Sequence, residues 1–177
     1  MVECLIFIVM ECLTGLVLTM SGISDKYPDF ISLAVLGIGS VWILGLFWRK
    51  TKKNNHFVIL LMGYILRVFI MLVNIYGADI LPIPNINTDC EGFFWTASHY
   101  YNGVQVDEYT KYPYIINGIF QFFGMNRVVA QYTNTFVWAM GVMLLMRMWK
   151  KFVLSDRGKT LVLFLIALWP NYILATM

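Results

Sequence analysis

The chain has 177 residues, of which 59% are hydrophobic and only 13% are charged. A globular domain has about 45–50% apolar and about 25% charged residues, so this composition argues against an ordinary soluble domain. The formal net charge of +3 is small, and we expect no nucleic-acid partner.

The apolar residues gather in five blocks that could each cross a bilayer, which takes roughly 20 residues for about 30 Å of hydrocarbon. The blocks are residues 5–23, 30–48, 57–76, 128–146 and 161–177. Each should be helical, because backbone polar groups in lipid must be satisfied within their own segment. The sequence therefore predicts an all-α, multi-pass transmembrane bundle of about five spans, forming one domain over residues 1–177. Because the last block has no polar flank, we expect this chain to be the N-terminal part of a longer protein.

Basic residues cluster in the short loops that follow the second and fourth blocks. These loops hold nine of the 13 basic residues: Arg49, Lys50, Lys52, Lys53, Arg147, Lys150, Lys151, Arg157 and Lys159. Lys and Arg are enriched in cytoplasmic loops, and the two loops fall on the same side if the five blocks alternate. We therefore expect a cell-membrane protein whose N-terminus is cytoplasmic and whose long segment 77–127 lies on the outer face.

One arginine, Arg67, lies near the middle of the third block. A charge within the hydrocarbon region is costly, so this side chain is expected to face the protein interior or a water-filled cavity. It could serve a functional site, or it could pair with Glu11 of the first block. The sequence leaves both interpretations open.

The outer segment is predicted to contain two short helices. Thr88 or Asp89 could cap a helix over residues 93–101. A second apolar helix, residues 115–123, is too short to span a bilayer. Aromatic residues are frequent in both, which is typical of helices at the membrane interface.

The outer segment also holds the side chains best suited to chemistry. Asp89 and Glu91 could act as a general base or as metal ligands, or could simply be solvated. His99 could join them around a divalent metal, but one histidine is a weak basis and we expect no cofactor. Lys111 and Arg127, the only basic residues of this segment, could bind a lipid phosphate or lipid headgroups.

Polar residues also open the fourth block. They are Gln131, Thr133, Asn134 and Thr135. Polar side chains in such a position usually make hydrogen bonds between helices, and we interpret these four in that way.

Three pieces, in order, carry a family resemblance. The first is an Arg-bearing span followed by Asp89, Phe93, Ala97 and the run Tyr100-Tyr101-Asn102-Gly103. The second is Lys111-Tyr112-Pro113-Tyr114 leading to Phe123-Gly124-Met125-Asn126. The third is Leu168-Trp169-Pro170-Asn171-Tyr172-Ile173-Leu174. In this order, residues 67–177 resemble the start of a GT-C superfamily glycosyltransferase, nearest to the dolichyl-phosphate-mannose protein mannosyltransferase and aminoarabinose transferase branch.

The sequence also departs from that family's pattern. The family's acidic pair is usually adjacent, whereas Cys90 separates Asp89 from Glu91 here. Tyr112 replaces one proline of a Lys-Pro-Pro element, and Gln131 stands at a position that is often Arg. Two spans precede the Arg-bearing helix that would normally come first. The chain thus resembles a divergent or partial member.

The resemblance implies a membrane enzyme that transfers a sugar from a polyprenyl-phosphate-linked donor to an acceptor on the outer face, without a metal. Asp89 would deprotonate the acceptor hydroxyl, and Lys111, with Arg67 as a second candidate, would stabilise the departing phosphate. The lipid-linked donor and membrane lipids would be its partners, with the acceptor unspecified. The candidate residues are Asp89 and Glu91 for catalysis and Lys111, Arg67, Arg127 and Tyr114 for substrate binding.

A second function class fits the same span pattern. A non-catalytic component of polysaccharide export, a flippase or a transporter would also carry intramembrane charges such as Glu11 and Arg67. Transporters, however, concentrate polar residues and broken helices near the middle of the membrane. This sequence places its acidic motif and short helices in the outer segment, which favours the enzyme.

Overall fold

The computed structural model describes residues 30–51, 54–77, 87–106, 111–151 and 154–168. These ranges contain six α-helices, one short 3₁₀ turn and no strand, which confirms the all-α prediction. The helices are α2 (Phe30–Lys50), α3 (Asn54–Tyr76), α4 (Asn87–Tyr101), α5 (Tyr112–Phe123), α6 (Arg127–Met148) and α7 (Asp156–Leu168), with η1 (Trp149–Lys151) before α7. The predicted block 5–23 lies outside the described residues.

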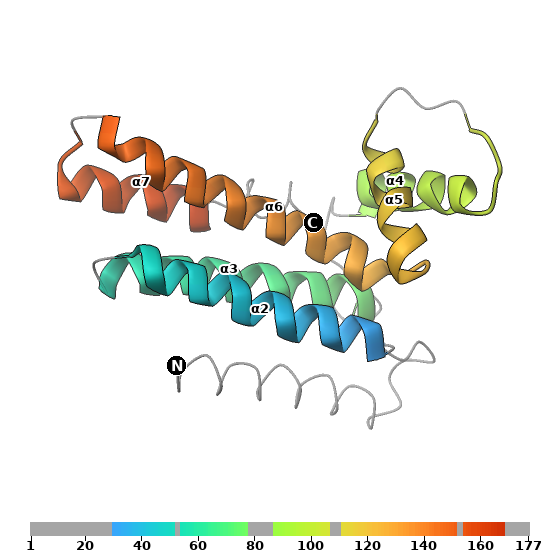
Figure 1. The fold of residues 1–177 in the computed structure, drawn as a ribbon, viewed down its shortest axis with the longest axis horizontal. Helices are drawn as coiled ribbons and strands as arrows, with labels where there is room; N and C mark the ends of the chain where they lie inside the picture. Colours follow the sequence, from blue (N-terminus) through green and yellow to red (C-terminus); the bar gives the residue numbers. More distant parts are fainter. Residues whose placement is uncertain (1–29, 52–53, 78–86, 107–110, 152–153, 169–177) are drawn as a thin grey trace.

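Four helices form a bundle. In Figure 1, α2, α3, α6 and α7 lie alongside one another; α3 packs on α7 and α6, and α2 packs on α6 and α3. The bundle interior contains large apolar side chains such as Ile43, Leu60 and Met71, all fully buried. The shorter α4 and α5 pack on each other at the end of the bundle where α6 begins, and α5 contacts α6.

Among the described residues, two helices are long and apolar enough to cross a bilayer. They are α3, whose apolar 18-residue stretch has a mean hydropathy of 2.4, and α6, whose corresponding stretch has a mean hydropathy of 1.3. The described part of α7 has 13 residues, about 20 Å at 1.5 Å per residue, which is shorter than the hydrocarbon core. The structure therefore supports two candidate spans, and the five predicted from the sequence are not confirmed.

The start of α4 differs from the prediction. The helix begins at Asn87, so Thr88 and Asp89 lie within its first turn rather than capping it. Its first residues are polar and carry no hydrophobic signal, which is why the sequence placed the helix only from residue 93, where the apolar residues begin.

The end of α4 is fixed by a reversal of the backbone. The N–H of Val104 donates to the carbonyl of His99 at 2.8 Å, and the N–H of Gly103 donates to that of Tyr100 at 3.1 Å. These two bonds form a Schellman motif. Gly103 has the positive φ of 78° that the motif requires at this position, where a side chain would be strained.

The start of α6 is fixed by a side-chain cap that also reaches α2. The Asn126 side chain accepts a hydrogen bond from the Val129 N–H at 3.1 Å, which satisfies one of the free donors of the first turn. Its amide nitrogen donates to Ser32 Oγ at 2.7 Å. The first turn of α6 is therefore held against the first part of α2, at the end of the bundle beside α4 and α5.

Candidate functional site

A small second core joins α4, α5 and α6. Phe93 lies edge to face with Tyr112, with ring centres 5.2 Å apart, and Phe94 lies in the same way against Phe120 at 5.5 Å. Ala130 of α6 is buried in the same cluster as Phe120. These aromatic contacts hold the two short helices against the first turns of α6.

This core contains a cavity of about 20 Å³, which is room for a single water-sized group. Its wall is formed by Phe93, Phe94, Tyr112, Ile116, Ala130, Gln131 and Asn134. Gln131 is only 8% exposed, and its Oε1 atom has no hydrogen-bond partner within the described part of the chain. The Tyr112 hydroxyl donates to Asn134 Oδ1. The cavity therefore has three aromatic rings in its wall and one amide oxygen that can accept a hydrogen bond.

The polar wall of the cavity continues along one face of α6. Arg127, Gln131 and Asn134 are spaced i, i+4, i+7, so they lie on the same side of the helix. The Arg127 guanidinium carbon lies 5.9 Å from the centre of the Phe94 ring, so this side faces α4. The sequence predicts hydrogen bonds between helices for Gln131 and Asn134, and Asn134 does make one, with Tyr112. Their spacing from Arg127 was the signal that could have grouped all three.

The two candidate carboxylates both belong to the beginning of α4. Asp89 and Glu91 lie within its first five residues. Positions two apart on an α-helix are about 200° apart around its axis, so the two residues occupy opposite sides of the helix. Their side chains lie outside the described residues, and their catalytic role stays a prediction.

Two candidate substrate-binding residues lie at the start of α5, next to Tyr112 of the cavity wall. Lys111 immediately precedes Tyr112, and its side chain is exposed and makes no cap hydrogen bond. Tyr114 is exposed too, and it stacks on Tyr100 of α4 with ring centres 4.5 Å apart. Both residues are accessible at the end of the bundle where the cavity lies.

His99, the possible third ligand of a metal, points back along its own helix. Its Nδ1–H donates to the carbonyl of Trp95 at 2.9 Å. Among the described side chains, no three of His, Cys, Asp or Glu lie close enough together to hold a metal ion. The side chains of Asp89 and Glu91 are not part of that set.

Arg67 lies elsewhere, inside the bundle. It is wholly buried, as predicted, and it donates to the carbonyls of Ala167 at 2.7 Å, Ile166 at 3.2 Å and Gly63 at 3.1 Å. Its guanidinium carbon lies 4.0 Å from the centre of the Trp138 ring. These partners belong to α3, α6 and α7, so the described contacts of Arg67 hold helices together. The predicted partner Glu11 lies outside the described residues.

Other interior polar groups also bond from helix to helix. Ser40 Oγ donates to the carbonyl of Leu36 at 2.5 Å, and the Tyr64 hydroxyl lies 2.5 Å from the same oxygen. Because Ser40 has a single hydrogen, Tyr64 is the donor in the second bond. Tyr132 extends this series of hydrogen bonds, because its hydroxyl lies 3.0 Å from that of Tyr64. One row of hydroxyls thus connects α2, α3 and α6.

A wider, open cleft of about 430 Å³ lies at the other end of the bundle. It is lined by Asn55, His56, Asp156, Arg157, Thr160, Leu161 and Phe164. The Thr160 hydroxyl donates to the carbonyl of Asp156 at 2.9 Å, so His56 must donate its Nε2–H to Thr160 Oγ1 at 2.9 Å. His56 is thereby used to join α3 to α7, and its Nε2 is not available as a base.

Comparisons of this chain with models of protein families, with curated proteins and with solved structures find no match.

Proposed function

We propose that this chain is a membrane glycosyltransferase, or the N-terminal portion of one, that transfers a sugar from a polyprenyl-phosphate-linked donor to an acceptor on the outer face. One observation carries the proposal. Two apolar helices, α3 and α6, are connected by two short helices that form their own core, and the acidic residues stand at the start of the first of these. This is the arrangement that the resemblance to GT-C enzymes implies for the first outer segment.

A membrane location is supported by the apolar outer faces of the bundle. Along α3 the exposed large side chains recur on one side of the helix: Val58, Met62, Ile65 and Phe69. Soluble monomers rarely expose a continuous apolar surface of this kind. The buried face of the same helix carries the polar side chains of Tyr64 and Arg67. Polar groups inside and large apolar groups outside are what a lipid solvent favours.

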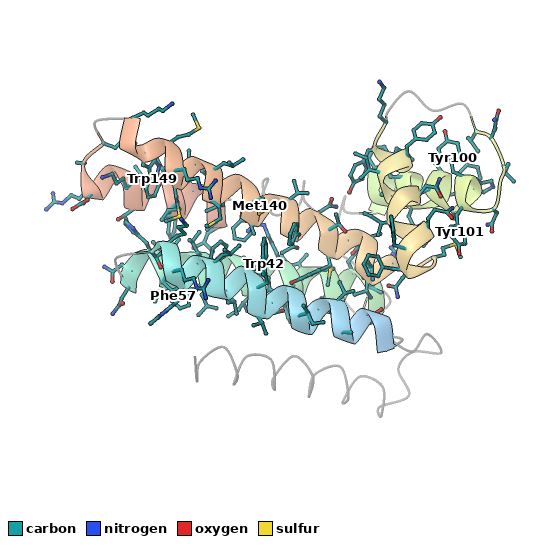
Figure 2. The ribbon with its side chains drawn as sticks, viewed as in Figure 1. Trp42, Phe57, Tyr100, Tyr101, Met140 and Trp149 are labelled. Atoms are coloured by element: carbon teal, nitrogen blue, oxygen red, sulfur yellow. The ribbon has the colours of Figure 1, made fainter. Side chains whose placement is uncertain are left out.

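Aromatic residues mark both ends of the bundle. Figure 2 shows Phe57 and Trp149 at one end and Tyr100 and Tyr101 at the other. The α3 helix has 23 residues, about 34 Å at 1.5 Å per residue, which matches the thickness of the hydrocarbon core. Tyr and Trp gather at the two membrane–water interfaces. We therefore place α4 and α5 at the outer interface and the basic end at the cytoplasmic one.

The proposed chemistry divides the roles among few residues. Asp89 would take the proton of the acceptor hydroxyl, whose oxygen attacks the anomeric carbon while the bond from that carbon to the phosphate oxygen breaks. The phosphate leaves with the bonding electrons, and Lys111 and Arg127 would stabilise its charge. Arg67 is less suited to this task, because its guanidinium is buried against helix carbonyls. Glu91 would face away from Asp89.

A non-catalytic transport component remains the alternative. The interior polar groups would be its strongest support, but Ser40, Tyr64 and Tyr132 bond to one another and Arg67 bonds to carbonyls. Groups engaged in joining helices are poor candidates for a substrate path.

The test is sugar transfer from a polyprenyl-phosphate donor in membranes that contain the full protein. Asp89→Asn should lower the transfer rate about 10²–10⁴-fold, because it removes the general base while keeping the size of the side chain. Glu91→Gln is the matched control and should have a milder effect. Both variants should be expressed at the level of the unchanged protein. Full activity in Asp89→Asn would leave the transport alternative ahead.

A further inference from the structure

We propose that the cavity between α4, α5 and α6 binds one hydroxyl group of a sugar, with Gln131 Oε1 as the hydrogen-bond acceptor. The inference rests on the proposed function and adds to it a residue that recognises the sugar itself.

Gln131 carries a buried acceptor atom at the wall of the cavity. Its Oε1 atom is buried without a hydrogen-bond partner among the described residues, although the residue lies at a polar face of α6 and lines a cavity. Buried polar atoms are nearly always paired in folded proteins, so an unpaired one beside a cavity indicates an absent partner. An amide oxygen only accepts hydrogen bonds, so that partner must donate one.

The surroundings of Gln131 restrict which kind of donor can bind to its Oε1 atom. Arg127 stands one turn before Gln131 on the same face of α6 and carries a positive charge, which disfavours a cationic donor such as an ammonium group. A neutral hydroxyl meets the requirement. The cavity of about 20 Å³ admits one such group and no larger part of a ligand.

The aromatic wall of the cavity favours a sugar hydroxyl over a simple water molecule. Phe93, Phe94 and Tyr112 line the cavity and are only partly buried, so part of their surface is accessible to a ligand. Aromatic rings provide the flat apolar surface on which the C–H face of a sugar ring packs. A sugar can therefore insert one hydroxyl toward Gln131 while its ring rests on these side chains.

The position of Arg127 fits the same arrangement. Four residues along a helix correspond to about 6 Å, a distance comparable to the width of a hexose ring. A sugar whose hydroxyl reaches Gln131 would thus have its phosphate-bearing side near Arg127. This places the sugar of a lipid-linked donor along the polar face of α6.

The experiment measures binding of methyl α-glucopyranoside to the full protein in a detergent without a sugar headgroup. Thermal unfolding is followed by the fluorescence of the protein's 6 tryptophans. Three variants are compared with the unchanged protein. Gln131→Met has a similar shape and no amide, and Gln131→Glu keeps an acceptor. Thr133→Val is the control on the same helix, since the Thr133 hydroxyl bonds only to its own helix, at Val129, among the contacts described.

We expect the glucoside to raise the unfolding temperature of the unchanged protein to a saturating value. Gln131→Met should weaken its apparent affinity about tenfold, the usual effect of losing one hydrogen bond in a buried site. Gln131→Glu and Thr133→Val should keep the affinity. Equal affinity in Gln131→Met and the unchanged protein overturns the proposal. So does the absence of any shift in the unchanged protein, which would mean that the cavity holds water only.

These outcomes are independent of the test of catalysis. Gln131-dependent binding without detectable transfer would support the sugar site while contradicting the proposed enzyme activity. Transfer that depends on Asp89, together with no Gln131-dependent binding, would support the enzyme activity while contradicting the sugar site.

Discussion

At the scale of single residues, Arg67 shows how a charge is accommodated inside the bundle. Its guanidinium meets the carbonyls of Ile166 and Ala167, near the C-terminal end of the described part of α7. Hydrogen bonds from a charged donor to carbonyls are stronger than those between neutral groups. Arg67 therefore supplies charged donors to two backbone carbonyls of α7.

Replacing Arg67 by methionine should therefore destabilise the bundle. We expect the free energy of unfolding to fall by about 2–3 kcal/mol, because buried carbonyls lose charged donors and Trp138 loses its cation contact. Unfolding in mixed micelles with increasing SDS measures the change. Arg67→Lys should recover only part of it, since an ammonium cannot reproduce the planar fork of the guanidinium.

The control for that experiment is Arg147→Met. Arg147 is exposed near the end of α6, so its loss should change the stability by less than about 0.5 kcal/mol. Equal effects of the two substitutions would show that the buried contacts of Arg67 contribute nothing specific.

The sequence predicted the burial of Arg67 but not its hydrogen-bond partners. The burial of Arg67 followed from the cost of a charge in an apolar block. Its partners Ile166 and Ala167 lie about a hundred positions away in the chain, and no local pattern marks them. The same holds for Gln131, whose unpaired oxygen becomes visible only when α4 and α5 are in place.

At the scale of elements, apolar blocks predicted where helices lie but not where they begin. The predicted helices 57–76 and 128–146 match α3 and α6 to within three residues at each end. By contrast, the helix predicted from residue 93 begins at Asn87. Hydrophobicity marks the buried or lipid-facing middle of a helix, whereas polar first turns and caps depend on backbone geometry that composition does not reveal.

Close contact between α3 and α7 depends on a glycine. A Cβ placed on Gly63 would lie 2.8 Å from Ala167 Cβ and 2.9 Å from the Ala167 carbonyl oxygen. Small residues allow helices in membranes to approach in this way. The Ala167 carbonyl also accepts a hydrogen bond from Arg67 at 2.7 Å. The close approach that Gly63 allows therefore also brings α7 within hydrogen-bond distance of Arg67.

We therefore expect Gly63→Ala to destabilise the bundle by about 1–3 kcal/mol, because a backbone atom of α7 would have to move away. Gly45→Ala is the matched control. No atom lies within 4 Å of a Cβ at position 45, so alanine there should be neutral or stabilising by up to about 1 kcal/mol. Unfolding in SDS mixed micelles compares the two variants. A neutral Gly63→Ala would mean that the helices are not as close as the structure places them.

At the scale of the whole molecule, polarity is arranged along the bundle as well as across it. Exposed basic residues occur at the end formed by η1 and the starts of α3 and α7, including Arg49, Lys151 and Arg157. The opposite end has α4 and α5, with Tyr100 and Tyr101 at the end of α4 (Figure 2). Lys and Arg are retained on the cytoplasmic side of membranes. The two ends therefore belong to different compartments if the bundle spans a bilayer.

That orientation can be tested by labelling single cysteines in a variant whose Cys4, Cys12 and Cys90 are replaced by serine. Asn102 lies just after α4 and Asn54 at the start of α3, and both are exposed, so burial does not limit their labelling. A membrane-impermeant maleimide should label Asn102→Cys in intact cells. It should label Asn54→Cys only after the membrane is permeabilised, because the basic residues around that end keep it in the cytoplasm. Labelling of Asn54→Cys in intact cells would reverse the proposed topology. It would also remove the acidic turn of α4 from the side where the lipid-linked sugar is expected.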